Sequence, residues 1–558
     1  MQTGWCFLGR CGFWLAVLVL MVAGPGAAGA ADAGEEPTPV YRGYGGQGVV
    51  SGSLHVLEIG AALFLIDVGT FFGGDGDNYP WPEEVAVEAV QAVFISHAHA
   101  DHLGRLPLLL REGYRGPIYM TGITYELARQ TLPDNLAFAD LGPERFYYSR
   151  HNAGRSRIPV YLEGYDFGHR TVQPDNRVYF TARRGELSAK GYYLARPQRD
   201  KLAAKLKQRL DRQVVVVDPG RPVMVADSGL QAEFLLTPHI PGSAMVRLTY
   251  GDYRILFSGD VGAGSSPMLP PNPVLTTEVD FLFLEGTMLY DRADADLARQ
   301  RQQFRREVAA MINAGKRVVI PAAVLDRSQQ VMFELSRAID QGKLPPHQVI
   351  RVCSPAANRL LRLYDDFARR YRLELADPAT GRQNYGRYFA PALARADFLP
   401  PGYKDECVGH EPDNPLGLQP GEIGIMASSM ADYSAARQAL LDYLEDPDTV
   451  FYFVGYQAPN SLGGHLTAGD RPPESLAIGA QRRLVRAAIH QTGAFAGHAD
   501  PAAMLTIFAE TAPQKVFLVH LEGEKGRHLA QRYRRELQTR VLLPEPQKRY
   551  RLVLPAAP

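Results

Sequence analysis

Three histidines and one aspartate occur within six consecutive positions of this 558-residue chain: His97, His99, Asp101 and His102. They follow the apolar run 92–95, which predicts a buried strand that ends at Ser96. From the end of that strand, the first two histidines would point the same way. The other two residues would return at the start of a helix that runs through Leu106. Imidazole nitrogens and carboxylate oxygens that converge in this way are the ligands of Zn²⁺ and similar cations, so the spacing favours a metal site over a polar loop.

Other apolar strands also end in residues that could bind a cation. One strand would deliver His239 into a loop of turn residues, and the next ends at Asp260. In this order, behind the first motif, they would supply a fifth ligand and a carboxylate that bridges two cations. Residues 48–57 and 61–67 are expected to form two strands, and Asp67 ends the second, where a buried carboxylate is costly unless it has a partner. We expect Asp67 to accept a hydrogen bond from a ligating imidazole, with a structural turn aspartate as the alternative.

A long segment separates Glu285, at the end of a third apolar strand, from the histidines that could complete the site, His498 and His520. The segment has its own alternation of helices and strands. The expected elements are helix 297–313, strand 317–321, a helix after Asp326, strand 423–427, helix 435–444 and strand 449–454. This is enough material for an inserted domain with a parallel sheet.

Together these motifs resemble the metallo-β-lactamase superfamily, and the late ones resemble its β-CASP branch of RNA- and DNA-processing nucleases. The superfamily motifs match Asp67, His97-x-His99-x-Asp101-His102, His239 and Asp260, and the branch motifs match Glu285, His498 and His520. Residues 320–329, 426–430 and 455–463 are also similar to parts of the β-CASP domain. A histidine at position 498 is typical of RNA-processing members.

The resemblance implies an α/β fold, a four-layer αββα metallo-β-lactamase sandwich with an inserted parallel-sheet α/β (β-CASP) domain. We expect the sandwich domain to begin with residues 40–289, the insert to span 290–486, and residues 487–558 to complete the sandwich.

The resemblance also implies two zinc ions, bridged by Asp260 and a water molecule that they activate. Each ion would have three further ligands: His97, His99 and His239 for one, and Asp101, His102 and His520 for the other. The implied catalytic residues are Asp101, Glu285 and His498. Steered by Glu285, His498 would protonate or stabilise the leaving oxygen. Arg327, Ser428 and Ser429 are candidates for binding phosphates, and ordinary helix-start or surface chemistry is the alternative for each.

The N-terminus has the pattern of an export signal. Arg10 precedes an apolar run over 13–23, which is followed by Gly24-Pro25 and small residues, so a signal peptide over 1–30 would be cut after Ala30. The alternative is an uncleaved anchor through residues 12–31, although the run is short for a span of about 20 residues. We expect an exported protein, periplasmic or secreted, without a stable membrane span after processing. Of the cysteines, Cys353 and Cys407 would remain, and the sequence leaves their pairing open.

Lys plus Arg and Asp plus Glu balance at 60 each, so binding of a polyanion would depend on local patches. Residues 183–212 are basic and contain Tyr192 and Tyr193, a pattern that could suit a nucleic acid. Because Leu202, Leu206 and Leu210 recur at helical spacing, a solvated amphipathic helix is favoured.

We predict a zinc-dependent metallohydrolase that cleaves phosphodiester bonds, a ribonuclease with RNA as its partner. Single-stranded DNA or another phosphodiester is the alternative substrate. The nearest alternative function is an exported hydrolase of another ester on the same scaffold, acting on a small phosphodiester or a lactone. A non-catalytic nucleic-acid-binding protein is a further alternative. The sequence leaves open whether the protein forms a homodimer and whether cleavage is endo- or exonucleolytic.

Overall fold

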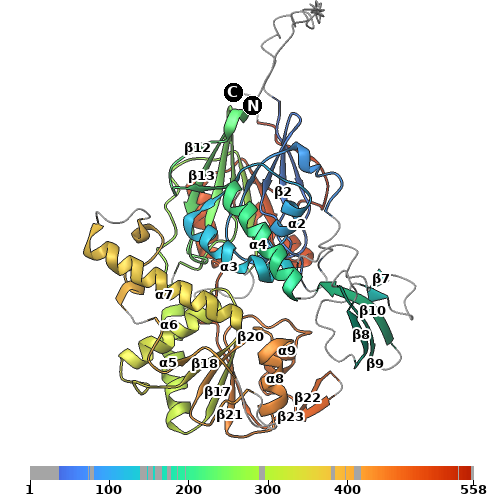
Figure 1. The fold of residues 1–558 in the computed structure, drawn as a ribbon. Coiled ribbons are helices and arrows are strands. Elements are labelled where there is room, and N and C mark those ends of the chain that lie inside the picture. The colour runs from blue at the N-terminus through green and yellow to red at the C-terminus, as the bar shows by residue number, and fades with distance from the viewer. Residues whose placement is uncertain are drawn as a thin grey trace, which may run out of the picture. The chain divides into compact units, whose positions relative to one another are not determined.

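The computed structural model describes residues 37–72, 75, 81–138, 147–148, 155–156, 166–172, 177–184, 187–194, 196–264, 266–287, 296–378, 384–395, 398–407, 416–479, 481–537 and 539–554 (Figure 1). The signal peptide predicted over 1–30 lies outside these residues. Within them, none of the helices has the length and apolar character needed to cross a bilayer.

The first sheet has seven strands in the order β11-β5-β4-β3-β2-β1-β27. The strands are β11 (Val214–Val217), β5 (Ile118–Thr121), β4 (Val90–Phe94), β3 (Ala62–Ile66), β2 (His55–Ile59), β1 (Val40–Gly43) and β27 (Tyr550–Arg551). β3, β4 and β5 are parallel, so their carboxyl ends meet at one edge of the sheet. This edge carries both Asp67 and the histidine motif. The strand expected over 48–57 begins only at His55, because Gly48 and Gly52 have φ of 70° and 78° and form a loop.

The second sheet also has seven strands, in the order β12-β13-β14-β15-β16-β25-β26. The strands are β12 (Val223–Met224), β13 (Leu230–Leu236), β14 (Ala244–Tyr250), β15 (Tyr253–Phe257), β16 (Phe281–Glu285), β25 (Lys515–Val519) and β26 (Arg540–Leu542). The last four are parallel neighbours. Asp260, Glu285 and His520 therefore follow or end adjacent strands at the same edge, although they are far apart in the sequence.

A ladder of aromatic rings fills the space between the two sheets. Phe257, Phe283 and Phe517 are aligned by the register of β15, β16 and β25. Their rings are stacked, with centroids 4.4 and 4.6 Å apart, and Tyr41 of the first sheet lies 4.3 Å from Phe283. Aromatic pairs at such separations add to the stability that burial alone gives. The ladder fixes the three strands relative to one another two or three residues before they deliver Asp260, Glu285 and His520.

Helices cover the outer faces of both sheets. On the first sheet, Leu127 of α3 (Gly122–Phe138) and Leu206 of α4 (Arg196–Gln213) share a core with Val93 of β4. On the second, Met504 of α10 (Pro501–Thr511) and Tyr533 of α11 (Gly523–Glu536) pack with residues of β16 and β25. The result is the four-layer αββα sandwich that the sequence predicts. The amphipathic helix predicted around residues 202–210 is confirmed as part of α4, which buries Leu206 and Leu210.

The segment between Glu285 and His498 forms a six-stranded sheet in the order β19-β18-β20-β17-β21-β24, with all pairs parallel. Its strands are β19 (Tyr403–Lys404), β18 (Ile350–Cys353), β20 (Ile423–Ala427), β17 (Arg317–Ala322), β21 (Thr449–Phe453) and β24 (Ala488–Gln491). β24 lies after residue 486, where the sequence predicts the insert to end. Cys353 at the end of β18 forms a disulfide with Cys407.

The α-helices described in this segment are α5 (Leu297–Asn313), α6 (Arg327–Asp340), α7 (Pro355–Ala376), α8 (Ser434–Tyr443) and α9 (Leu462–Thr467). Three further, smaller sheets comprise β6 (Tyr147–Tyr148) with β7 (Arg155–Ser156), β8 (Asp166–Val172) with β9 (Arg177–Arg184) and β10 (Leu187–Leu194), and β22 (Ser475–Ile478) with β23 (Gln481–Leu484).

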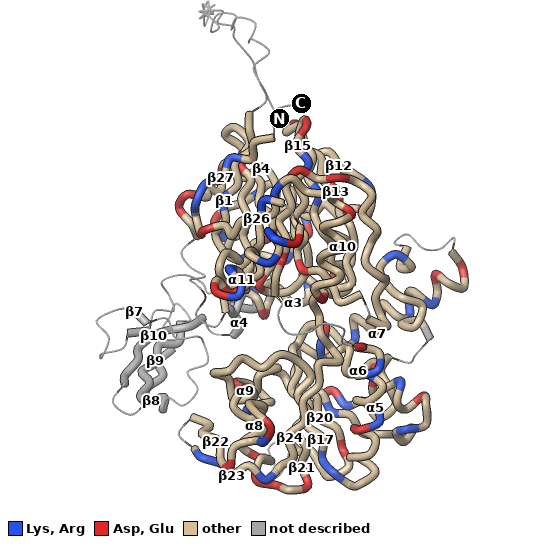
Figure 2. Tube along the Cα trace, turned by 180° about the vertical axis from the view of Figure 1, so that it is seen from behind, with Lys and Arg blue, Asp and Glu red and all other residues tan. Residues whose placement is uncertain are grey.

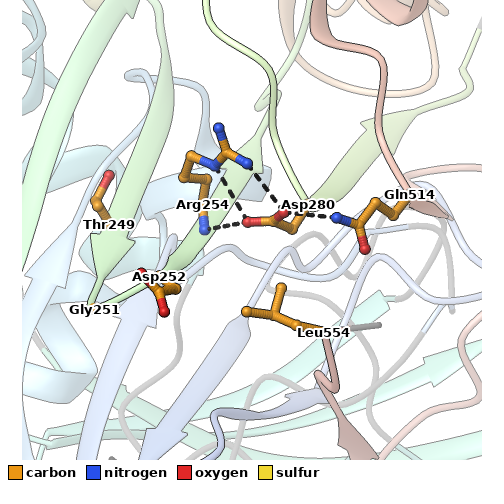
Figure 3. Close-up of a pocket in the computed structure, with 7 residues that line it drawn as sticks. All are labelled: Thr249, Gly251, Asp252, Arg254, Asp280, Gln514 and Leu554. Atoms are coloured by element: carbon orange, nitrogen blue, oxygen red, sulfur yellow. Dashed lines mark hydrogen bonds and ion pairs between the residues drawn. The ribbon is translucent and has the colours of Figure 1, made fainter. Parts of the chain in front are cut away.

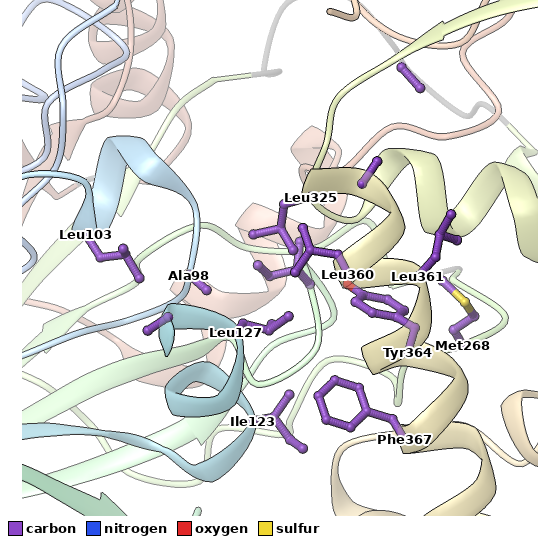
Figure 4. Packing of buried hydrophobic residues seen from close by; sticks show 14 of the residues in the cluster. Ala98, Leu103, Ile123, Leu127, Met268, Leu325, Leu360, Leu361, Tyr364 and Phe367 are labelled. Atoms are coloured by element: carbon purple, nitrogen blue, oxygen red, sulfur yellow. The ribbon is translucent and has the colours of Figure 1, made fainter. Parts of the chain in front are cut away.

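The sandwich and the inserted sheet share one hydrophobic core where α3 meets α7. Figure 4 shows Ile123 and Leu127 of α3 close to Tyr364 and Phe367 of α7, all of them buried. Beside this core, Arg370 of α7 forms an ion pair with Glu126 of α3 at 3.0 Å. The insert is therefore packed against the sandwich by a continuous apolar contact, close to the edge where the histidine motif lies.

Candidate metal centre

The histidine motif occupies the connection from β4 to two short helices. α1 (Ala100–Leu103) is followed by α2 (Leu106–Arg111), so the single helix expected through Leu106 is wrong. The reason is Pro107, which lies in the first turn of α2. Proline has no N–H to continue the preceding helix and is favoured in a first turn. The break leaves Arg105 buried, where its side chain donates hydrogen bonds to the carbonyls of Gly69 and Gly52.

Four residues predicted as ligands converge into a first group. His99 Nδ1 lies 3.2 Å from His97 Nε2 and 3.0 Å from His239 Nε2. Asp260 Oδ2 lies 3.6 Å from His97 Nε2 and 3.3 Å from His239 Nε2. Ligand atoms that each lie about 2.0–2.1 Å from a tetrahedral Zn²⁺ are about 3.3–3.4 Å apart. The four atoms therefore have the mutual spacing of ligands around one small cation.

Three more predicted ligands form a second group against the other oxygen of Asp260. Oδ1 of that carboxylate lies 3.1 Å from His102 Nε2 and 3.6 Å from His520 Nε2. His520 Nε2 is also 3.3 Å from Asp101 Oδ2. Asp260 thus lies between the two groups, with one carboxylate oxygen turned to each.

Asp67 and Thr287 orient the imidazoles of the second group through the ring nitrogens that face away from Asp260. Asp67 accepts hydrogen bonds from the N–H and the hydroxyl of Ser96, and its Oδ2 is 2.7 Å from His102 Nδ1. His520 Nδ1 is 2.6 Å from Thr287 Oγ1, and the backbone N–H of His520 donates to the carbonyl of Gly46. Asp67 and His520 both have positive φ, at 60° and 56°. Such backbone is uncommon outside glycine and is often kept at functional sites.

The chemistry of these buried groups fits a metal ion. Burial lowers the pKa of His97 and of His239 well below the usual range, so both imidazoles are neutral at pH 7 and offer lone pairs. His102 Nε2 and Asp260 Oδ1 are buried 3.1 Å apart, and apart from this mutual contact neither atom has a hydrogen-bond partner among the described residues. Polar atoms of this kind are costly unless something binds them. Bound cations would satisfy both atoms.

Glu285 and His498 form a separate pair at the rim of the centre. His498 Nδ1 lies 3.0 and 3.1 Å from the two carboxylate oxygens of Glu285, and 3.9 Å from Asp260 Oδ2. Burial alone would lower the pKa of His498, but the carboxylates of Glu285 and Asp260 raise it to about 9. Glu285 is itself held by the backbone N–H groups of Val261 and Thr287. His498 is therefore a protonatable imidazole whose Nδ1 is fixed and whose Nε2 remains for another partner.

The three residues predicted to bind phosphate differ in whether they contact the metal centre. The Arg327 guanidinium donates to the carbonyl of Phe495 and lies against Gly497, where a Cβ would be 2.8 Å from Nη2. The carbonyl of Gly497 is 2.8 Å from His239 Nδ1, so Arg327 borders the first group. Ser428 has φ of 82° and is buried, and its Oγ has no partner within the described structure. Neither Ser428 nor Ser429 forms a hydrogen bond with the clustered residues among those described.

Several contributors were not predicted from the sequence. Ser96 and Thr287 supply hydroxyl groups behind the imidazoles, and Gly46 and Gly497 supply carbonyl oxygens. The hydroxyl residues carry a weak signal, because each lies within two residues of a predicted site residue near a strand end. The glycines carry none, since every residue type has a carbonyl group.

Three family models match successive parts of the chain. Residues 48–310 match the metallo-beta-lactamase superfamily, residues 328–466 the Beta-Casp domain, and residues 483–544 the Zn-dependent metallo-hydrolase RNA specificity domain. Among similar proteins, a ribonuclease of Thermus thermophilus is 29% identical over 488 residues, covering 86% of this chain and 93% of that protein. The transcription termination factor FttA of Methanothermobacter thermautotrophicus is 23% identical, covering 87% and 67%. Integrator complex subunit 11 of Gallus gallus is 22% identical, covering 89% and 71%.

The two late histidines should differ in their effect on bound metal. His520→Ala removes an imidazole from the second group and should lose part of the bound metal, whereas His498→Ala removes a group held by Glu285 and should keep all of it. Metal analysis of the purified variants, beside the wild type and Asp260→Ala, measures this directly. Asp260→Ala should deplete both groups, since its carboxylate faces both. Equal metal loss in the two histidine variants would contradict this division.

Proposed function

Because the chain belongs to the metallo-β-lactamase superfamily, in its β-CASP branch, we propose that it is a zinc-dependent hydrolase that cleaves phosphodiester bonds in RNA. The observation that carries the proposal is the position of Asp260 between two groups of ligand atoms, with the Glu285–His498 pair beside it. This arrangement combines a site for cations with a separate proton donor. Hydrolysis of a phosphodiester needs both, because an oxygen nucleophile must attack and an alkoxide must leave.

Two ions are the number that the ligand atoms favour. His97, His99 and His239 would hold one, Asp101, His102 and His520 the other, and Asp260 would contact both. When bound, such a pair of cations stabilises the charge on a phosphodiester and lowers the pKa of water toward 7. Zinc is favoured over calcium or magnesium because imidazole nitrogens outnumber carboxylates among the ligands.

The residues of the chain provide the remaining chemistry. Glu285 holds Nδ1 of His498, which leaves Nε2 as the ring nitrogen that donates a proton to the leaving oxygen. Asp67 plays a comparable part for His102, fixing its ring so that Nε2 faces Asp260. Asp101 supplies a carboxylate beside His520. The guanidinium of Arg327 adds positive charge beside the first group, where a phosphate oxygen would be bound.

Support for RNA as the substrate comes from two directions. The family model that matches residues 483–544 is that of an RNA specificity domain. A relative that matches most of the chain is a ribonuclease. His498, rather than another residue type, also occupies the position that is typical of RNA-processing members. Ser428, whose buried hydroxyl has no partner in the described structure, and Ser429 are the further phosphate contacts that we propose.

We also propose that the protein is exported. The disulfide between Cys353 and Cys407 supports this, because disulfides persist in oxidising compartments and are rare in the cytosol. It agrees with the signal peptide expected over 1–30. The native protein should begin near Ala31 and contain no free thiol at these two cysteines. N-terminal sequencing and thiol labelling test both points, and a soluble cytoplasmic form that retains Met1 would contradict export.

The purified protein should cleave single-stranded RNA and lose that activity with its metal. Removal by a chelator should abolish cleavage, and added Zn²⁺ should restore it. The assay compares RNA, single-stranded DNA, a small phosphodiester and a lactone under the same conditions. Hydrolysis of the small ester or the lactone without cleavage of either nucleic acid would replace the ribonuclease assignment with the alternative hydrolase.

Loss of the His498 imidazole should depend on the leaving group. With RNA, His498→Ala should lower turnover about 10²–10⁴-fold, because the leaving oxygen then departs without a proton donor. With a nitrophenyl phosphodiester, whose leaving group needs no proton, the same variant should be much less impaired. Glu285→Gln should follow the same pattern more weakly, since it leaves the imidazole in place. Equal loss on both substrates would show that His498 is not the proton donor.

A further inference from the structure

Positive charge is concentrated near the end of this otherwise neutral chain. The full sequence has 60 basic and 60 acidic residues, whereas residues 515–551 contain ten Lys or Arg and four Glu, with no Asp. A net charge of this size over one short stretch produces a local potential even when the whole protein is neutral. Much of this stretch is α11 and the edge strands β26 and β27.

α11 presents its basic residues on the face that is turned away from the sandwich. Leu529, Ala530 and Tyr533 are buried against the second sheet. Arg527, Arg532 and Arg535 lie on the exposed face. Arg532 forms an ion pair with Glu536 at 2.8 Å, whereas Arg527 and Arg535 form none among the described residues. The exposed side of this amphipathic helix therefore carries an excess of positive charge, and at 1.5 Å per residue the helix is about 21 Å long.

The helix connects the metal centre with the opposite end of the sandwich. It begins three residues after His520, and the N–H of Gly523 bonds to the carbonyl of Gly48 at 3.0 Å. β25 and β26 are parallel, so α11 must return from the edge that carries the site to the edge where both strands begin. Arg540, the first residue of β26, lies at that far edge.

A cavity of about 540 Å³ lies at this far end, lined by residues of both edge strands. Its lining includes Lys515, Arg540 and Arg551. Among the described residues, no carboxylate forms an ion pair with any of these three side chains. Burial and the nearby Arg540 together lower the pKa of Lys515. Cations that repel one another in this way are stabilised when an anion binds between them.

A second cavity nearby shows the opposite arrangement. It has a volume of about 440 Å³ and is lined by Arg254 and Asp280, among others. Figure 3 shows that the Asp280 carboxylate accepts from both the guanidinium and the backbone N–H of Arg254, and from Gln514 as well. The charge of Arg254 is thus balanced within the protein, and with Asp252 also in the lining this cavity has no excess positive charge to bind an anion.

We infer that α11 and the basic cavity form a cationic track that binds the phosphate backbone of one RNA strand outside the metal centre. The track consists of Arg527, Arg535, Lys515, Arg540 and Arg551, and Figure 2 shows Lys and Arg on α11, β26 and β27. The inference rests on the proposed ribonuclease function and adds where the strand runs beyond the scissile bond. A row of cations fits a sequence-independent grip on the phosphate backbone.

The track variant carries Arg527→Gln, Arg535→Gln, Arg540→Gln and Arg551→Gln, all at exposed positions. Its control removes the same charge from exposed sites on the insert, with Arg306→Gln, Arg369→Gln, Lys404→Gln and Arg482→Gln. Both sets are combined with His498→Ala, so that cleavage of bound RNA is slow compared with the binding measurement. Affinity is measured for RNAs of about 30 and about 6 nucleotides over a range of salt concentrations.

The track variant should bind the long RNA about tenfold or more weakly than the control, and its salt slope should fall by about 2–3, since each lost phosphate contact in a single strand contributes about 0.7. Affinity for the short RNA should match that of the control, because a short strand occupies only the metal centre. With His498 restored, both variants should hydrolyse a nitrophenyl phosphodiester as the wild type does, which shows that each is folded.

Equal affinity of the two variants for the long RNA would contradict the track. If the wild type still cleaves RNA in that case, the proposed ribonuclease function is unaffected. RNA that is bound through the track but never cut by the wild type would refute the function and keep the track. A wild type that binds no RNA refutes both. Vesicles of anionic lipid serve as a further arm: if the track variant loses only vesicle binding, the surface contacts lipid and the RNA track is wrong.

Discussion

The buried carboxylate of Asp260 sets the main constraint on this structure. A carboxylate away from water is costly unless opposite charge or hydrogen-bond donors surround it. Burial alone would raise the pKa of Asp260, but His102 and His520 hold it well below the usual range. His97, His239 and His498 approach the same group from other segments. Residues that follow β4, β13 and β25 are thereby brought to one charge, although they lie far apart in the sequence.

The sequence predicts most of the elements around the site because their hydrophobic periods are strong. Helix 297–313 and strand 423–427 have the predicted bounds, and Asp296 caps the helix by accepting from the N–H of Arg299. The errors have local causes. Gly48 and Gly52 turn a predicted strand into a loop, and Pro107 divides a predicted helix. Short strands such as β18 and β24 were missed, since a few buried residues in a row carry no period that separates strand from helix.

Side chains and backbone groups differ in how well the sequence predicts them at the site. The structure brings the seven candidate ligands together, and each lies in the segment that follows a strand, with Asp101 and His102 in the short helix α1. Gly497 contributes a carbonyl to His239, and Gly46 contributes one to the backbone of His520. These contacts depend on the path of the chain and not on residue type. Arg327 reaches the centre only because the segment that returns from the insert passes beside it.

The contact between α3 and α7 limits how the substrate can enter. Ile123 and Leu127 on one side and Tyr364 and Phe367 on the other belong to a single buried cluster. Swinging the insert away from the sandwich would expose these side chains, at about 1.5–3 kcal/mol for each one bared. This cost opposes any opening of the insert about the contact between α3 and α7. Substrate must therefore reach the metal centre with this contact intact.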